Sequence, residues 1–253
     1  MKLLLKRKDV SPDRPGNGGH TPLSLATCNE HVGVVELLLE REDVSADKPD
    51  NRGQTLLSWA ARNGHDGVVG LLLGREDVSS DRLDDYGQTP VSWAAQNGHD
   101  RVVKLLLERE DVNPDRPDNG GQTPLLLAAA NGHDAVTRLL LEREDINPDR
   151  PDNWGQTPLS LATRNGHDRV VGLLLEREDV SFDLPGIHGQ TPLSLAAENG
   201  HDGIVKLLLG REDVSPGKPD NYGQTPLLWA ARNGHDRVVE LLKARKAATS
   251  RTL

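Results

Sequence analysis

Seven histidines recur along the chain at a fixed spacing of 34 residues, and histidine is a common metal ligand and acid–base group. They are His31, His65, His99, His133, His167, His201 and His235. Zinc needs ligand nitrogens about 2.0–2.1 Å from one centre, whereas packed helices lie about 8–10 Å apart. Equivalent histidines of successive repeats therefore cannot share one metal ion. We expect each of them to form hydrogen bonds within a turn.

Other side chains capable of chemistry do not form a recognisable catalytic set. The recurring serines lack a histidine–acid pair that is not itself part of the repeated pattern. His20 and His188 stand apart from the histidine series, and no GxxxxGK phosphate-binding loop is present. The sequence therefore predicts no enzyme activity, no cofactor and no metal.

The histidines belong to a longer repeated unit, which reads GQTPVSWAAQNGHDRVVKLLLEREDVNPDRPDNG from Gly87 to Gly120. Its copies open, without insertion or deletion, at Gly19, Gly53, Gly87, Gly121, Gly155, Gly189 and Gly223. A period of this length is typical of a solenoid, in which each unit packs on its neighbours. The repeat therefore predicts one elongated domain for the 253 residues.

Each unit predicts two helices and a polar arm. Thr89 is suited to cap a short first helix over Pro90–Gln96, because threonine caps free amides and proline is favoured at the first helical position. Gly98 should end that helix in the left-handed conformation. Asp100 is expected to cap a second helix that runs to about Glu110. The polar segment 111–120 then reads as an extended arm that ends in a turn.

The TPL motif at the start of the unit and the GH pair between the helices resemble the ankyrin repeat. This resemblance covers nearly the whole sequence and implies an all-α solenoid of paired antiparallel helices with hairpin-like arms. Two features depart from the family pattern: serine or leucine follows TPL where histidine is usual, and the period is one residue longer. The tetratricopeptide repeat fits poorly, because it would place proline and Asn-Gly inside helices.

The repeat also predicts the domain boundaries. Residues 1–18 align with a second helix and arm, so we expect a half repeat there and a fragment of a longer protein. Residues 19–246 hold seven repeats, and 247–253 are expected to be a disordered tail. Glu30 replaces the turn glycine in the first repeat, which should strain the backbone, and the irregular segment Phe182–His188 predicts an altered arm tip.

The composition limits which partners we expect this protein to bind and where in the cell we expect it to lie. The formal net charge is −9 and the pI is about 5.5, which disfavours nucleic acid as a partner. Much of the acidic charge lies in the recurring ERED segment, which we interpret as solvated outer surface. The single cysteine, Cys28, excludes an internal disulfide, and no apolar run approaches a membrane span or a signal peptide. We therefore expect a cytoplasmic monomer that binds neither membrane nor nucleic acid.

Positions that differ between copies are candidates for recognition, since they are not needed in every repeat for folding. The residue before each opening glycine forms a tip set: Gly18, Arg52, Tyr86, Gly120, Trp154, His188 and Tyr222. The residue before the first-helix alanine forms a helix set: Leu25, Trp59, Trp93, Leu127, Leu161, Leu195 and Trp229. The residue before Asn-Gly forms a third set: Cys28, Arg62, Gln96, Ala130, Arg164, Glu198 and Arg232.

The ankyrin resemblance implies that the first set lies at the arm tips and that the other two face the concave groove, where this family binds proteins. Six of the seven aromatic residues fall in these sets, and aromatic residues and arginine are enriched at binding hot spots. The predicted partner-binding residues are Arg52, Tyr86, Trp154, His188, Tyr222, Trp59, Trp93, Trp229, Arg62, Gln96, Arg164 and Arg232. Alternatively, the three helix-set tryptophans only fill space between helices, as leucine does in sister repeats.

The sequence thus predicts a module that binds another protein or peptide. The near-identical copies resemble the C-terminal arrays of fungal receptors of the NACHT-plus-ankyrin type, which implies a ligand-sensing role within a larger receptor-like protein. Two alternatives stay open: a consensus-like or engineered scaffold without a dedicated partner, and nucleic-acid binding through Arg62, Arg164 and Arg232.

Overall fold

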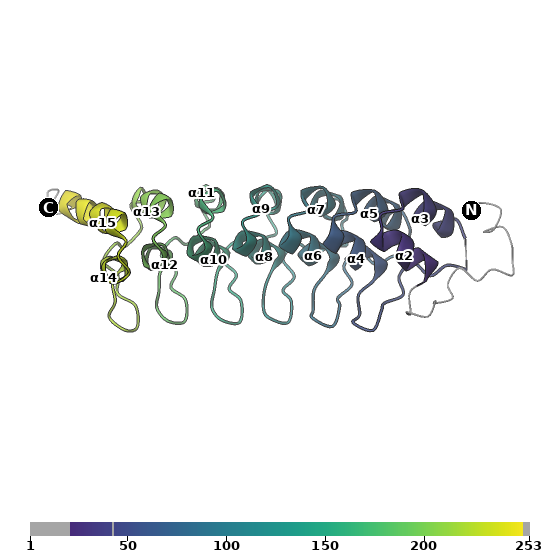
Figure 1. Cartoon of the computed structure of the whole chain (residues 1–253), viewed down its shortest axis with the longest axis horizontal. Coiled ribbons are helices and arrows are strands. Elements are labelled where there is room, and N and C mark those ends of the chain that lie inside the picture. Colours follow the sequence, from purple (N-terminus) through teal and green to yellow (C-terminus); the bar gives the residue numbers. More distant parts are fainter. Residues whose placement is uncertain (1–20, 42, 250–253) are drawn as a thin grey trace. The chain divides into compact units, whose positions relative to one another are not determined.

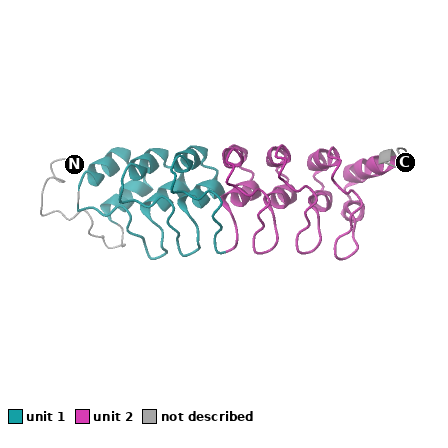
Figure 2. Ribbon diagram, turned by 180° about the vertical axis from the view of Figure 1, so that it is seen from behind, with its two compact units in different colours: residues 1–119 teal, residues 120–253 magenta. Residues whose placement is uncertain are grey.

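A computed structural model describes residues 21–41 and 43–249. The expected half repeat at 1–18 and the tip residue Gly18 therefore lie outside the described residues. The protein divides into two compact units, residues 1–119 and 120–253 (Figure 2). The sequence predicts one elongated domain, and this stays a prediction. In a repeat array each repeat packs only on its neighbours, so no single core holds all the repeats together.

Unit 1 contains three pairs of helices within its described residues. Its first helices are α2 (Pro22–Cys28), α4 (Leu56–Asn63) and α6 (Pro90–Asn97), and its second helices are α3 (Val32–Leu39), α5 (Asp66–Leu73) and α7 (Asp100–Leu107). The first helices form one layer and the second helices another, and the arms extend from the first-helix layer (Figure 1).

Unit 2 repeats this arrangement with four pairs. Its first helices are α8 (Pro124–Asn131), α10 (Pro158–Asn165), α12 (Pro192–Asn199) and α14 (Pro226–Arg232), and its second helices are α9 (Asp134–Leu141), α11 (Asp168–Leu175), α13 (Asp202–Leu209) and α15 (Asp236–Thr249). Across 21–41 and 43–249 the protein forms fourteen α-helices and no β-strand, which confirms the all-α prediction. None of these helices is both long and apolar enough to span a bilayer.

Two predicted helix ends were wrong. Second helices such as α7 end at Leu107 rather than near Glu110. Beyond this end, Arg109 donates hydrogen bonds to Asp111 at 3.1 Å and to the Leu73 carbonyl oxygen at 3.5 Å. The last helix, α15, continues through residues 247–249, where the disordered tail was expected to begin. Alanine is the strongest helix former and cations are favoured near a helix C-terminus, so an Ala- and Lys-rich end prolongs the helix.

The first helices begin and end as their caps predict. Thr89 Oγ1 accepts a hydrogen bond from the Ser92 amide at 3.2 Å, and Gly98 ends α6 in the left-handed conformation with φ 75°. The predicted cap of the second helix was wrong, because His99 occupies the N-cap position of α7 without a side-chain cap bond. Asp100 is instead the first residue inside that helix, where its charge suits the helix dipole.

Five of the recurring histidines, His65, His99, His167, His201 and His235, bond to the preceding repeat rather than within their own turn. His99 Nε2 lies 3.0 Å from the carbonyl oxygen of Arg62 in unit 1, and His201 Nε2 lies 3.0 Å from that of Arg164 in unit 2. Each ring thereby satisfies a carbonyl at the open end of the preceding first helix. The prediction of a structural role stands, but the bond partner is the neighbouring repeat.

The ERED segments are also more than solvated surface. Arg177 donates two hydrogen bonds to Asp179, at 2.8 and 2.6 Å, and a third to the carbonyl oxygen of Leu141 in the preceding repeat at 2.6 Å. The hydrogen bonds from Arg177 hold the pKa of Asp179 below its usual range. Within the two units, an arginine of this segment bonds to the end of the previous second helix in four repeats, at Arg75, Arg109, Arg177 and Arg211. The described glutamates of the segment are exposed.

Glu30 is the one non-glycine residue with positive φ among the described residues, at 54°. It stands where other repeats have glycine, and a side chain there costs about 1–2 kcal/mol. We expect Glu30→Gly to raise the free energy of unfolding by about 1 kcal/mol, measured by urea denaturation. The exposed contact between Glu30 and His65, at 3.5 Å, contributes little. Glu30→Gln removes the charge but keeps the side chain, so an equal gain there would show that charge and not backbone strain is the cause.

Candidate functional site

The arm tips expose large aromatic side chains. Tyr86 and Trp154 are each 54% exposed and Tyr222 is 71% exposed, while Arg52 and His188 also lie on the surface. In unit 2 the rings of His188 and Tyr222 lie 6.4 Å apart, centroid to centroid. The tip set therefore presents apolar area to solvent in both units.

An aspartate at the base of each regular arm holds the tip in place. In four arms its Oδ1 atom accepts the amide hydrogens of the residues two and four positions later, at 2.8–2.9 Å. These aspartates are Asp50, Asp84, Asp152 and Asp220. Burial raises the pKa of Asp220, but the hydrogen bonds from Gln224, Trp229 and Tyr222 outweigh it and hold the pKa below its usual value.

The three helix-set tryptophans bond to the same aspartates. The indole N–H groups of Trp59, Trp93 and Trp229 lie 3.2, 3.0 and 2.9 Å from the Oδ2 atoms of the aspartates nine residues earlier. All three side chains are half-buried. They therefore have a structural role in anchoring the arms, and their contact with a partner stays a prediction.

Cationic members of the third set stack on these indoles. In unit 1 the Arg62 guanidinium lies 4.4 Å from the centroid of Trp93 and 5.8 Å from that of Trp59. In unit 2 Arg232 lies 5.8 Å from the centroid of Trp229. Gln96 is half-buried on α6. The unit 1 residues thus form a cation–aromatic cluster, which disfavours their use as free phosphate ligands.

The arm of Asp152 lacks this tryptophan, because Leu161 occupies the position. Asp152 is 5% exposed and its Oδ2 atom has no hydrogen-bond partner among the described residues. We expect Leu161→Trp to supply the missing indole donor and to raise the free energy of unfolding by about 1 kcal/mol, the usual net value of a hydrogen bond. Urea denaturation measures this gain. Leu161→Phe adds bulk without a donor, and an equal gain there would contradict the hydrogen-bond explanation.

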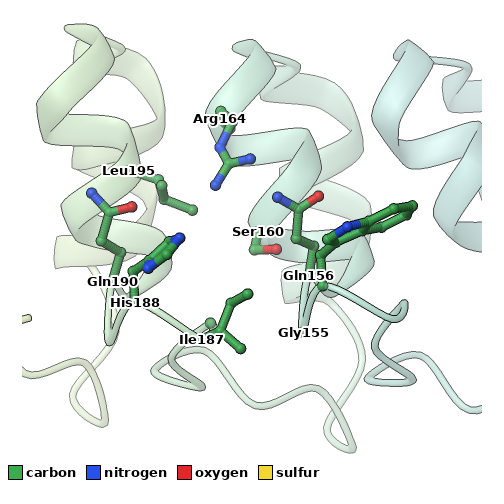
Figure 3. Close-up of a pocket in the computed structure, with 10 residues that line it drawn as sticks. Gly155, Gln156, Ser160, Arg164, Ile187, His188, Gln190 and Leu195 are labelled. Carbon is green, nitrogen blue, oxygen red and sulfur yellow. The ribbon is translucent and has the colours of Figure 1, made fainter. Parts of the chain in front are cut away.

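Unit 2 contains a cavity of about 210 Å³ between the fifth and sixth repeats. Figure 3 shows Arg164 and Gln156 on one side of it and His188, Gln190 and Leu195 on the other, with Ile187 below. Trp154, Gly155, Ser160 and Gly186 complete its lining. The cavity brings three predicted residues together: Trp154, Arg164 and His188.

Sequence reasoning missed the arm aspartates and the cavity residues Gln156, Ser160 and Gln190. Leu195 belongs to the helix set but was not among the predicted partner-binding residues, and Gly186 and Ile187 lie in the segment for which only an altered arm tip was predicted. A signal for them was present, since Gly186 stands where the regular arms have aspartate and the arm is recognisably irregular in the sequence. Within 21–41 and 43–249, no cluster of three His, Cys, Asp or Glu side chains is arranged to hold a metal ion.

The repeat geometry and the surfaces described above define a repeat-solenoid protein with variable arms and first helices. The family model "Ankyrin repeats (3 copies)" matches residues 1–82, 42–118, 110–184 and 178–251, so the chain belongs to the ankyrin-repeat family. The structure is similar to the crystal structure of the ankyrin repeat domain of Bcl-3, described as a unique member of the IkappaB protein family. The TM-score is 0.75 and the identity 26%, over 89% of this chain and 99% of that chain. The search of curated protein sequences found no significant match.

Proposed function

We propose that this protein recognises another polypeptide through its arm tips and first-helix surface. Ankyrin repeats are protein–protein interaction modules, and the observation that carries the proposal here is the exposure of Tyr86, Trp154 and Tyr222. Repeated framework residues are buried or bonded within the fold. These three vary between copies, bond to the frame through their backbone and leave their rings in solvent.

Exposed aromatic side chains suit this role energetically. Tyrosine and tryptophan bury large areas at low entropic cost, and they dominate the energetics of many interfaces. The acidic charge of −9 supports a polypeptide partner rather than a nucleic acid. Exposed aromatic tip residues occur in both units, Tyr86 in unit 1 and Trp154 and Tyr222 in unit 2, so we expect each unit to contribute to binding.

We further propose that these repeats are the ligand-sensing part of a larger, cytoplasmic, receptor-like protein, and that the protein acts as a monomer. The support for this is the resemblance to the repeat arrays of fungal NACHT-type receptors. In that setting, ligand binding across several repeats would shift an autoinhibited state of the whole receptor. A scaffold without a dedicated partner is the alternative.

The test is affinity capture from a lysate of the source organism, with a variant carrying alanine at Tyr86, Trp154 and Tyr222. We expect the parent to retain a protein that the variant loses, while circular dichroism shows that the variant is folded. The matched control carries alanine at Glu110, Glu144 and Glu178, which are exposed and follow the second helices α7, α9 and α11. This control should capture as the parent does.

Equal capture by the parent and the aromatic variant would exclude the tips as the binding site. Capture by neither would favour the scaffold alternative. Loss of capture in the glutamate control would instead place recognition at the ends of the second helices.

A further inference from the structure

The irregular arm that leads from the fifth repeat into the sixth, Phe182–His188, is called the sixth arm here, and it lacks the carboxylate that organises the regular arms. Gly186 stands at the aspartate position, and no acceptor in the described residues pairs with the amide N–H groups of His188 and Gln190. In four other arms the equivalent two amides donate to a single aspartate oxygen. The sixth arm thus keeps both donors and has lost their acceptor.

The backbone of this arm is otherwise regular. Gly186 N still donates to the Gln190 carbonyl at 3.1 Å, and Gly189 N to the Gly186 carbonyl at 2.8 Å, as in the arm of Asp220. The two free amides are therefore held in the same turn that presents them to an aspartate elsewhere. The site is preorganised rather than collapsed.

A third donor in the cavity also lacks its usual acceptor. In unit 1 the side-chain amides of Gln54 and Gln88 lie 3.2 and 3.4 Å from the carboxylates of Asp84 and Asp118 in the next arm. Gln156 is their counterpart in the fifth repeat, but its next arm carries Gly186. The Gln156 side chain lines the cavity without a hydrogen bond to another described residue.

The arms on either side of the cavity are also not joined. Elsewhere in the two units, a backbone amide of one arm donates to the tip carbonyl of the previous arm, as Asn119 does to Tyr86 and Asn221 to His188, at 3.0 and 3.1 Å. Ile187 makes no such bond to Trp154. The cavity therefore opens where this ladder is interrupted, between two tip residues.

Arg164 adds a positive charge to this set of donors. Its guanidinium is half-buried, lines the cavity and pairs with no carboxylate in the described residues. Figure 3 shows it pointing toward the space between Gln156 and Gln190. The nearest acidic side chain on α12, Glu198, is engaged by the Gln190 side-chain amide at 2.9 Å. The cavity wall, built from described residues alone, carries no carboxylate.

We propose that this cavity binds a carboxylate of the partner polypeptide, which takes the place of the missing aspartate. The amides of His188 and Gln190, the Gln156 side chain and Arg164 are its donors, and Trp154 and Ile187 contact the polypeptide that carries it. The volume of about 210 Å³ is well above the ~10–15 Å³ that a single water needs, so the cavity has room for one carboxylate and its neighbouring atoms. This inference rests on the proposed function only in assigning the carboxylate to a polypeptide.

The carboxylate has two possible sources, an acidic side chain or the free C-terminus of a polypeptide, and short peptides distinguish them. The probes are acetyl-Gly-Asp-Gly-amide, acetyl-Gly-Gly-Gly with a free C-terminus, and acetyl-Gly-Asn-Gly-amide as the neutral control. Amide NMR resonances of Ile187, His188 and Gln190 report binding during titration. We expect at least one acidic probe to shift them with about tenfold higher affinity than the control, because charge-assisted hydrogen bonds exceed neutral ones by about a factor of two in energy.

Gly186→Asp is the decisive variant, because it restores the carboxylate within the protein itself. A Cβ at Gly186 would lie 3.6 Å from the Gly155 carbonyl oxygen, an ordinary contact, so the side chain has room. We expect the variant to raise the urea midpoint and to abolish binding of both acidic probes. Gly217→Asp adds the same charge at a glycine with open space around it and outside the cavity lining, and it should bind as the parent does.

Arg164→Gln provides a second test that does not depend on the arm, and it should weaken binding about fivefold or more. The proposal is overturned if neither acidic probe exceeds the neutral one, if Gly186→Asp binds them as well as the parent, or if Arg164→Gln leaves affinity unchanged. If Gly186→Asp still captures the partner and the aromatic variant does not, the carboxylate site is refuted and the aromatic tips are not. Capture unaffected by the aromatic variant but lost in Gly186→Asp would refute the aromatic tips alone.

Discussion

Replacing Gly166 by alanine should lower the free energy of unfolding of unit 2 by about 2–3 kcal/mol. Gly166 ends α10 with φ 78°, a conformation that costs an L-residue about 1–2 kcal/mol. A Cβ there would lie 2.7 Å from Cε1 of His201, so the imidazole must move. Its 3.0 Å hydrogen bond to the Arg164 carbonyl would then weaken, at a further cost of about 1 kcal/mol.

Gly172→Ala is the matched control in the same repeat. Gly172 lies inside α11 with nothing within 4 Å of an added Cβ, so alanine should stabilise the helix by up to about 1 kcal/mol. Urea denaturation and hydrogen exchange of the α10–α12 amides measure both variants. If Gly166→Ala were neutral, the tight packing of the histidine on the previous repeat would not contribute to stability.

Replacing Leu208 by alanine should cost about 3 kcal/mol, whereas the same change at Leu207 should cost less than about 1 kcal/mol. Both belong to the leucine triplet of α13, but Leu208 is fully buried and Leu207 is 41% exposed. Truncating a buried leucine removes its transfer free energy and leaves a cavity, at about 2–5 kcal/mol. An exposed leucine loses little on truncation because it already contacts solvent.

The two variants make the same leucine-to-alanine change in the same helix, so the change in helix propensity is the same. The difference between their free energies of unfolding therefore reports the burial of the side chain. Urea denaturation gives both values. Equal costs would mean that α13 is rotated relative to the structure described above, or that the outer face of the second helices is covered by another molecule in solution.

These predictions distinguish residues that recur in every repeat, called the framework here, from positions at which one repeat differs from the others. Framework residues such as Gly166 and Leu208 have the same role in each repeat, and changing them should affect stability. Gly186 is a departure of this kind, because it removes the aspartate partner of a repeated bond and leaves the amide donors without it. Leu161 is the residue type found in four of the seven repeats, and beside Asp152 it leaves one carboxylate oxygen without an indole donor. The carboxylate site proposed at Gly186 is one such unpaired position.

The sequence alone predicted the repeat length, the helix pairs, the glycine turns and the family, because each depends on a pattern that recurs every 34 residues. It also predicted that Glu30 strains its turn and that the arm at Phe182–His188 is irregular, since single departures stand out against near-identical copies. The predicted cap and the predicted C-terminal end of the second helix were wrong. Both depend on which of several nearby side chains bonds to the backbone, and the repeated pattern does not determine this.

Only the tertiary structure decided which atoms meet across repeats. The bond from His201 to the preceding repeat does not follow from spacing, because it depends on how successive repeats stack. The bond from Trp93 to Asp84 joins residues nine positions apart, and it depends on the path of the arm that precedes the first helix. The same holds for the candidate site. The sequence identified Trp154, Arg164 and His188 as variable positions, but only the tertiary structure shows that they line one cavity together with Gln156 and Gly186. The repeated sequence specifies the local fold of each repeat, whereas packing between neighbouring repeats decides which atoms a side chain contacts across them.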